Sequence, residues 1–497
     1  MTRTPGRRRL TIGLAIAAVI IAAIATVAPS STAAGGRASA SAAADYITAR
    51  RLDLGTPGLA VGVVTESEQV SRSAGDLSPT TPMPVGSVTK SFTALAVMQL
   101  AEAGVLALDS PVVAYLARFT TADPSNSREI TVRELLSHTS GIPTRAGLSP
   151  LSEPATTLSA QVAALSRVHT GRPGQFAYSN ANYLVLGELV ERVSGQSYAA
   201  YVRQHILAPL DMTHTYTDLA SARAAGLRPG HRIWFGVGVP TGTFYRADFL
   251  PAGFLISTGS DLQHYVAALL DDGAFRGRRV LSTAGVHALF ESAAPGIVFG
   301  TPGGYGLGWF QRPTAGLSLD IDPGIAQNVH ADLVLDRVHH VGVVLLADGE
   351  SDLYLASIPK IDLAAMNAAL IAGQGAPASG LVEGLYLIFD LVVVGSVLWY
   401  ARSLARVLKR RVRGYPRPVW RIAIAVWREV LIPVGIVVEL PAVYSEPWSY
   451  LLTGDVGLSA ALIAGLGIAT FLVRTANAIR LVHYASGHRA VLAKESS

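Results

Sequence analysis

Cysteine is absent from this chain of 497 residues. Its absence excludes disulfides, thiolate catalysis, a lipid-modified amino-terminal cysteine and any zinc site built on cysteine. The 12 histidines form no H-E-x-x-H motif and show no paired metal-ligand spacing. The sequence therefore contains no sign of a metal site.

Charged residues are also scarce. They make up 15% of the chain while hydrophobic residues make up 50%, a balance that points to membrane segments rather than to a wholly soluble protein. Lysine is rarest among the basic residues, with Lys90, Lys360, Lys409 and Lys494 as its four positions. Each lysine is therefore a candidate for a specific role.

The net charge of +5 is explained by where the basic residues lie. Arginines between Arg3 and Arg9 precede an apolar run, and seven basic residues lie between Arg402 and Arg417 beside another. Basic residues that flank apolar spans orient a protein in a membrane and do not form a phosphate-binding face. We therefore expect contact with membrane lipid and no nucleic-acid partner.

Residues 1–40 have the layout of a signal peptide. An arginine-rich start is followed by an apolar stretch from Leu10 to about Ala28 and by small residues up to Ala40. The apolar stretch is also long enough to serve as an uncleaved anchor. Both interpretations export the segment that follows.

Residues 44–373 show the mixed pattern of a globular domain. The β-rich runs Leu59–Val64 and Val341–Leu346 predict strands near its two ends. Apolar residues at three- and four-residue spacing predict a helix from Phe92 to Ala103, closed by Gly104. Strands at both ends and helices between them predict an α/β or α+β sandwich.

Three apolar spans of membrane length follow this domain, at residues 381–400, 422–444 and 456–473. Pro433 and Pro441 interrupt the second span. Buried core helices would be the alternative, but three successive spans with basic flanks favour transmembrane helices. The sequence does not identify a protein partner for them.

The positive-inside rule predicts their orientation. The arginine-rich loop 401–418 and the tail 474–497 should be cytoplasmic. Residues 44–373 should then lie on the extracytoplasmic side, to which the amino-terminal signal independently directs them. The predicted location is a multi-pass protein of the cell membrane.

The most specific local motif is Ser87-Val-Thr-Lys90 at the start of an amphipathic helix. This spacing puts the serine and the lysine on one face, about a turn apart. A serine hydroxyl needs a proton acceptor, and a lysine of lowered pKa can provide one. A second match, Ser357-Ile-Pro-Lys360, lacks the flanking glycine and the long apolar helix, so we interpret it as a coincidence.

A second feature surrounds Tyr178 and Asn180. Pro173-Gly174 marks a turn, and a helix is expected from Tyr183 to Val193. On the loop before that helix, a phenol can transfer a proton, and an amide can bind the lysine or a substrate carbonyl. A loop tyrosine followed by a helix-capping asparagine would explain the same pattern.

Taken together, these motifs resemble class C β-lactamases and penicillin-binding proteins, a family of serine hydrolases. Seven blocks follow one another in the order found in that family: Pro57–Val64, Gly86–Phe92, Ile130–Pro143, Tyr178–Asn180, Leu207–Met212, Pro251–Thr258 and Tyr305–Phe310. The resemblance covers about residues 50–350. It implies an antiparallel sheet flanked by helices together with an all-helical region, and no metal or organic cofactor.

The resemblance also implies roles for individual residues. Ser87 would be the acylated nucleophile, Lys90 its proton acceptor and Tyr178 a second proton-transfer group. Asn180 would orient Lys90 and the substrate. The backbone N–H of Ser87 would supply half of an oxyanion hole. His138 is expected to have a structural place in its loop.

The third motif departs from the family pattern. The family keeps K-T-G, H-S-G or H-T-G shortly before a Pro-Gly, whereas here the triplet before Pro323-Gly324 reads Ser318-Leu319-Asp320. If Ser318 and Asp320 contact the substrate, no basic residue anchors a carboxylate and an acidic one repels it. Phe254 also replaces a frequent glycine, and His340-Val-Gly342 matches H-x-G only by spelling.

The leading hypothesis is a membrane-tethered serine hydrolase that forms an acyl-enzyme on a small-molecule or peptide ester or amide. A first alternative is a non-hydrolytic sensor or binding domain, in which Ser87 binds or is acylated without turnover. A second is a membrane scaffold with an inactive hydrolase fold. The altered third motif favours the alternatives, and the intact Ser87, Lys90, Tyr178 and Asn180 oppose them.

Overall fold

The computed structural model describes most of the predicted globular domain and two of the apolar spans: residues 39–49, 56–148, 151, 154–234, 237–298, 301–314, 317–350, 381–409 and 458–477. The predicted signal segment 1–38, the coincidental match at 357–360 and the span 422–444 lie outside the described residues.

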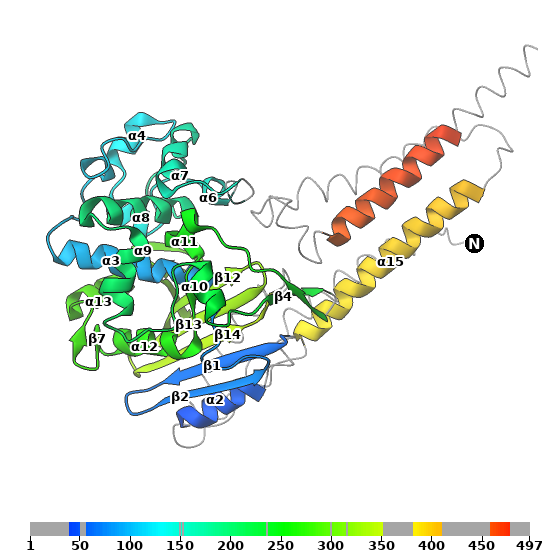
Figure 1. Cartoon of the computed structure of the whole chain (residues 1–497). Coiled ribbons are helices and arrows are strands. Elements are labelled where there is room, and N and C mark those ends of the chain that lie inside the picture. The colour runs from blue at the N-terminus through cyan, green and yellow to red at the C-terminus, as the bar shows by residue number, and fades with distance from the viewer. Residues whose placement is uncertain are drawn as a thin grey trace, which may run out of the picture.

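An antiparallel sheet forms the centre of the domain (Figure 1). Its eight strands lie in the order β2 (Gln69–Gly75), β1 (Gly58–Val64), β14 (Val341–Ala347), β13 (Val329–Asp336), β12 (Leu317–Ala326), β11 (Phe310–Thr314), β10 (Thr301–Tyr305) and β9 (Ala294–Val298). The first and last parts of the domain therefore share one sheet. Their joint is the pair of β1 with β14, in which Leu59 faces Ala347 and Val64 faces Gly342.

Both faces of this sheet are covered, which explains why β1, β13 and β14 are buried along their whole lengths. Alternate residues of a strand point to opposite faces. Leu333 and Leu335 of β13 join the core beneath the helices, while Val334 joins a second core with Ile47. Ile47 belongs to α2 (Ala40–Ala49), which packs on β1 and β2 and begins four residues before the predicted domain start.

Helices from the middle of the chain cover the other face (Figure 1). The longest are α3 (Thr89–Glu102), α8 (Asn180–Ser194), α12 (Gly259–Leu270) and α13 (Thr283–Phe290). Shorter ones are α4 (Pro124–Glu129), α5 (Val132–Leu136), α6 (Thr144–Leu148), α7 (Leu158–Ala164), α9 (Tyr198–Val202), α10 (Leu219–Ala224) and α11 (Leu250–Gly253). The predicted order of strands, helices and strands is confirmed.

Small two- and three-stranded sheets complete the domain. They pair β15 (Gly349–Glu350) with β4 (Gly230–Trp234) and β4 with β5 (Val237–Thr241), β3 (Met83–Pro84) with β6 (Ile256–Ser257), and β7 (Ala274–Phe275) with β8 (Arg278–Arg279). The pair of β3 and β6 matters for the site, because it ties the segment before Ser87 to the segment after α11.

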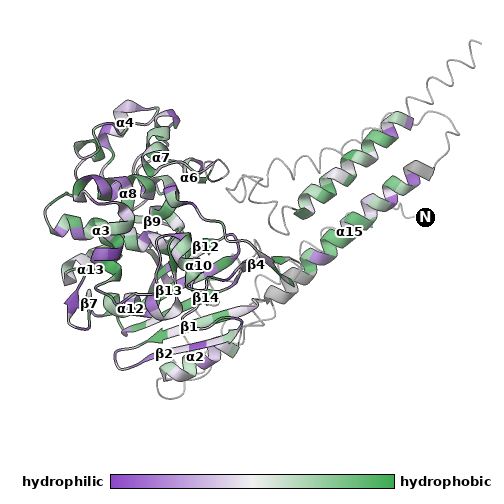
Figure 2. Cartoon of the chain, viewed as in Figure 1, coloured by the Kyte–Doolittle hydropathy of each residue, from purple (hydrophilic) through white to green (hydrophobic). Residues whose placement is uncertain are grey.

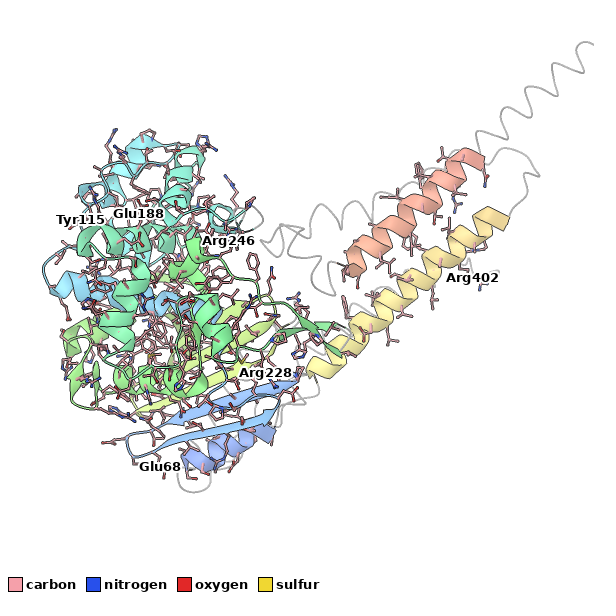
Figure 3. All side chains as sticks on the ribbon, viewed as in Figure 1. Glu68, Tyr115, Glu188, Arg228, Arg246 and Arg402 are labelled. Atoms are coloured by element: carbon pink, nitrogen blue, oxygen red, sulfur yellow. The ribbon has the colours of Figure 1, made fainter. Side chains whose placement is uncertain are left out.

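Among the described residues, two apolar helices follow the domain: α15 (Leu381–Lys409) and the helix at Leu458–Asn477. Both are long and apolar enough to cross a membrane, at Ile388–Arg406 and Leu458–Asn477, which by itself is weak support for a membrane span. In Figure 2, which colours the ribbon by hydropathy, hydrophobic residues make up most of both helices. In Figure 3, Arg402 lies toward the carboxyl end of α15, so the predicted loop 401–418 begins as a continuation of this helix.

Candidate active site

Ser87 lies in the 3₁₀ turn η1 (Gly86–Val88), which leads directly into α3. Gly86 has a φ of 52°, a conformation that favours glycine. A Cβ at Gly86 would also lie 2.6 Å from the carbonyl oxygen of Ile325, and a Cβ at Gly324 would overlap the carbonyl oxygen of Val85. Strand β12 therefore runs directly beside the Ser87 turn.

Lys90 reaches back to this turn from the first turn of α3. Its Nζ lies 3.0 Å from the Oγ of Ser87 and donates to the carbonyl oxygen of Ala252 at 2.5 Å. The residue is 1% exposed. Burial lowers the pKa of Lys90 from its ordinary 10.5 to about 7, with the nearby Asp322 acting in the opposite direction. A substantial neutral fraction at neutral pH can therefore accept a proton from Ser87.

Tyr178 completes the cluster from the loop before α8. Its side chain hydrogen-bonds with Ser87, and its ring centroid lies 4.9 Å from the Nζ of Lys90. Burial raises the pKa of the phenol above its ordinary value of 10, and the Ser87 hydrogen bond opposes this change. The phenol is therefore protonated and available as a proton donor at Ser87. The structure thus brings Ser87, Lys90 and Tyr178 together.

Asn180 lies close in sequence but makes a different contact. It is the first residue of α8, which begins three residues before the predicted start at Tyr183. Its Nδ2 donates to the carbonyl oxygen of Gly147 at 3.4 Å, at the end of α6. Lys90 instead bonds Ser87 and Ala252. Orientation of Lys90 or of substrate by Asn180 stays a prediction.

Ser318 and Asp320 lie at the other end of β12 from the nucleophile. Asp320 accepts a hydrogen bond from the Nε of Arg337 at 2.7 Å. Burial raises the pKa of its carboxyl to about 6, and Arg337 opposes this effect. Asp320 lies four positions before Gly324, which is about 13 Å along a strand. Substrate binding by Ser318 and Asp320 stays a prediction.

The residue that the sequence interpretation missed is Asp322. It is 3% exposed, shares a face of β12 with Gly324 and interacts with Lys90 and Ser91. Its Oδ2 has no hydrogen-bond partner among the residues that the structure describes. Burial raises the pKa of Asp322, and Ser91 and Lys90 act against this rise. The sequence did contain a signal for this residue. Because side chains alternate between the two faces of a strand, Asp322 lies on the same face as Gly324 of the Pro-Gly pair.

The segment at Pro251–Phe254 forms the opposite wall of the turn. The carbonyl oxygen of Ala252 accepts from Lys90, and a Cβ at Gly253 would lie 3.7 Å from the backbone of Gly86. Phe254, which replaces a frequent glycine of the family, is half-buried. Its ring centroid lies 5.8 Å from that of Phe244 and 5.9 Å from that of Tyr245. Phe254 therefore directly follows the residue that approaches the Ser87 turn, and its ring belongs to a cluster of aromatic side chains.

The domain described above is also found in other proteins. The family profile described as Beta-lactamase matches residues 38–365. The chain belongs to the β-lactamase family. The matched segment ends before α15, so the two apolar helices lie beyond the shared domain.

This β-lactamase-family chain is similar to a protein of Staphylococcus aureus, to a penicillin-binding protein and to a class C β-lactamase. Protein flp of Staphylococcus aureus (strain MW2) is 26% identical over 415 residues, 78% of each chain. Penicillin-binding protein 4 of Amycolatopsis lactamdurans is 31% identical over 262 residues, 50% of this chain and 68% of that one. The class C β-lactamase of Rhodobacter sphaeroides is 19% identical with a TM-score of 0.55, covering 66% of this chain and 98% of that structure. The predicted family resemblance and the predicted α/β fold of the domain are confirmed.

The residues that the structure describes offer no group of three or more histidine and carboxylate side chains that could hold a metal ion. The hydroxyl of Ser87 lies within hydrogen-bonding distance of the buried amine of Lys90 and of the protonated phenol of Tyr178. This set supports nucleophilic attack with proton transfer.

Proposed function

We propose that the chain is a membrane-tethered serine hydrolase that forms an acyl-enzyme on Ser87. The observation that carries the proposal is the 3.0 Å separation of Ser87 Oγ from the Nζ of a fully buried lysine. Neutral Lys90 takes the hydroxyl proton as Oγ bonds to the substrate carbonyl carbon. The carbonyl electron pair moves to oxygen, then returns as the bond to the leaving group breaks.

Tyr178 completes the proton balance in this scheme. Its phenol donates a proton to the departing alkoxide or amine and recovers one from Lys90. Water then attacks the ester carbonyl of the acyl-enzyme and loses a proton to the same pair, and Ser87 Oγ leaves with a proton. The hydrogen bond of Tyr178 with Ser87 and its 4.9 Å distance from Lys90 support this route.

Uncharged esters or amides are the proposed substrate class. Lys90 is the basic residue beside Ser87, and the acidic Asp322 faces it from β12. This pair has no net charge whether the proton lies on the lysine and the carboxylate is ionised or both groups are neutral. A substrate carboxylate therefore gains no net attraction from the pair. The half-buried rings at Phe244, Tyr245 and Phe254 favour an apolar group next to the scissile bond.

The proposed location is the cell membrane, with the hydrolase domain outside. Arg474 donates to Ser403 at 3.5 Å near the carboxyl ends of both apolar helices, which lie side by side in Figure 1 and run in the same direction. Parallel spans need a connection that crosses back, which supports the span predicted at 422–444. The basic residues from Arg402 to Arg417 support a cytoplasmic location for that end of α15.

Acylation and turnover can be separated experimentally. Intact-protein mass spectrometry after treatment with a fluorophosphonate should show one adduct, and peptide mapping should place it on Ser87. Ser87→Ala should abolish it, and a surviving adduct would contradict the proposal. With a chromogenic neutral ester, a hydrolase shows a burst followed by steady release. A single equivalent would indicate the sensor alternative, and no release would indicate an inactive scaffold.

Substrate charge provides a second test. Matched phenyl esters, one with a free carboxylate and one with its methyl ester, should differ by tenfold or more in kcat/KM in favour of the neutral compound. Below about pH 7, where Lys90 is protonated, Asp322→Asn removes the carboxylate that balances the lysine and should lower KM for the anionic ester relative to the neutral one by about tenfold, which corresponds to about 1.4 kcal/mol. Efficient hydrolysis of a penicillin by the unmodified chain would contradict the charge argument.

A further inference from the structure

His138 is a buried histidine in an unusual backbone conformation. It follows α5, is fully buried and has a φ of 59°, in the left-handed region that non-glycine residues seldom adopt. Its loop packs against the segment that carries Tyr178, although 40 residues separate the two in sequence. Such a backbone conformation persists only where neighbouring contacts stabilise it.

Two hydrogen bonds tie His138 to the residues on both sides of Tyr178. Its carbonyl oxygen accepts from the N–H of Ala177 at 2.8 Å, and its Nδ1 accepts from the N–H of Ser179 at 3.1 Å. The imidazole also packs against the phenol ring, with centroids 4.4 Å apart. The backbone before Tyr178, the backbone after it and its ring therefore all contact one residue.

These contacts require a neutral imidazole. Because Nδ1 accepts from Ser179 and also lies 3.0 Å from the Nδ2 of Asn182, the ring proton belongs on Nε2. Burial lowers the pKa of His138 well below its ordinary 6.5, and the charge of Lys90 acts in the same direction. The acceptor is therefore present throughout the pH range in which Lys90 titrates.

We propose that His138 is the positioning residue for Tyr178, holding the phenol at the hydrogen-bonding position beside Ser87 during acylation. The proposal rests on the function proposed above for Ser87 and Tyr178. The hydrogen bond from Ser179 to Nδ1 sets the direction in which the chain enters α8, and the imidazole ring limits the rotation of the phenol. A displacement of a catalytic group by about 1 Å can reduce a rate by about a hundredfold.

Two substitutions distinguish the effect of the hydrogen-bond acceptor of His138 from the effect of its side-chain volume. His138→Asn places an amide oxygen near the position of Nδ1, and asparagine tolerates left-handed backbone. His138→Leu keeps an apolar volume but leaves the Ser179 N–H without its acceptor. In the full chain, the Asn variant should acylate Ser87 within about threefold of the wild type. The Leu variant should acylate about 30- to 100-fold more slowly, with KM changed by less than about threefold.

Combination with Tyr178→Phe identifies the route of the effect. If His138 acts through the phenol, His138→Leu should slow acylation by less than about threefold when Tyr178 is already Phe. Leu189→Ala provides a control for general destabilisation, because Leu189 is a buried residue of the same helix α8. It should lower the melting temperature and leave the acylation rate of the folded fraction unchanged.

Several outcomes would overturn the proposal. An Asn variant as slow as the Leu variant, or an equal loss from His138→Leu with and without the phenol, would each do so. If the Leu variant does not fold, His138→Gln replaces it, since its amide extends past the Nδ1 position, and the same rates apply. A wild-type chain that leaves Ser87 unlabelled would overturn the proposed function together with this inference. Normal labelling with unaffected variants would overturn the inference alone.

Discussion

Lys90 is an ionisable residue that is completely buried. Only burial separates its pKa of about 7 from the ordinary 10.5, since the neighbouring Asp322 would raise it. The S-x-x-K spacing predicted that Ser87 and Lys90 share a helix face, and the 3.0 Å contact agrees with that geometry. The extent of burial depends on α11 and β12, which are distant in sequence, so it could not be predicted from the motif.

Lys90→Arg should abolish acylation of Ser87 although it keeps the positive charge. A guanidinium stays protonated at any workable pH and cannot accept the serine proton. The measurement is the rate of fluorophosphonate labelling, with folding checked by circular dichroism. Labelling within about tenfold of the wild-type rate, a barrier change of only about 1.4 kcal/mol, would show that Lys90 acts electrostatically or structurally.

Acylation by the wild type should depend on pH through the same lysine. The reactive form is neutral Lys90, whose fraction falls as pH drops below its pKa of about 7. The rate should therefore fall by about tenfold per pH unit well below pH 7 and level off above about pH 8. Burst kinetics with a neutral ester between pH 5 and 9 would measure this profile. A rate independent of pH over that range would contradict the role of Lys90.

Among the elements, β12 determines what faces the nucleophile. The family resemblance indicated that the segment before Pro323-Gly324 contributes to the site, but it did not specify which residue faces Lys90. The structure places Gly324 against Val85 and brings Asp322 close to Lys90. Pairing with β13 fixes this register, with Asp322 opposite Leu333. A shift of even one residue would reverse which side chains face the helices.

Gly324→Ala tests this close approach. The added methyl group would overlap the carbonyl oxygen of Val85, which belongs to the backbone and cannot rotate away. We expect a loss of about 1–3 kcal/mol in the free energy of unfolding, as in other overpacked cores, and slower acylation of Ser87. Denaturant unfolding and labelling rates measure the two effects. Gly242→Ala is the matched control, because a Cβ there would meet no atom within 4 Å. Equal stability of both variants would contradict the packing of β12 against the turn.

At the scale of the whole molecule, the order of elements separates the domain from the two apolar helices. The β1–β14 pair closes the sheet between residues almost 290 positions apart, as from Leu59 to Ala347. The apolar helices follow that closure and lie outside the family match. Membrane attachment can therefore be tested without altering the catalytic domain.

A protease recognition site inserted between residues 373 and 381 should release the hydrolase domain. In isolated membranes, the uncut chain should resist extraction by high salt and dissolve in detergent. After cleavage, the fluorophosphonate-labelled fragment should appear in the soluble fraction, unless an uncleaved amino-terminal anchor retains it. Cleavage from the cytoplasmic side only would contradict the predicted orientation, and salt extraction of the uncut chain would contradict the membrane spans.

The sequence alone determined the properties that depend on local spacing. The shared helix face of Ser87 and Lys90, the strands at the two ends of the domain and the apolar character of 381–400 and 456–473 all follow from short-range periodicity. Only the tertiary structure decided the properties that need distant segments to meet. These are the burial of Lys90, the approach of Asp322 to Lys90 and the hydrogen bonds from Ala177 and Ser179 to His138. Strand register and desolvation depend on packing partners far along the chain, and no local pattern specifies those partners.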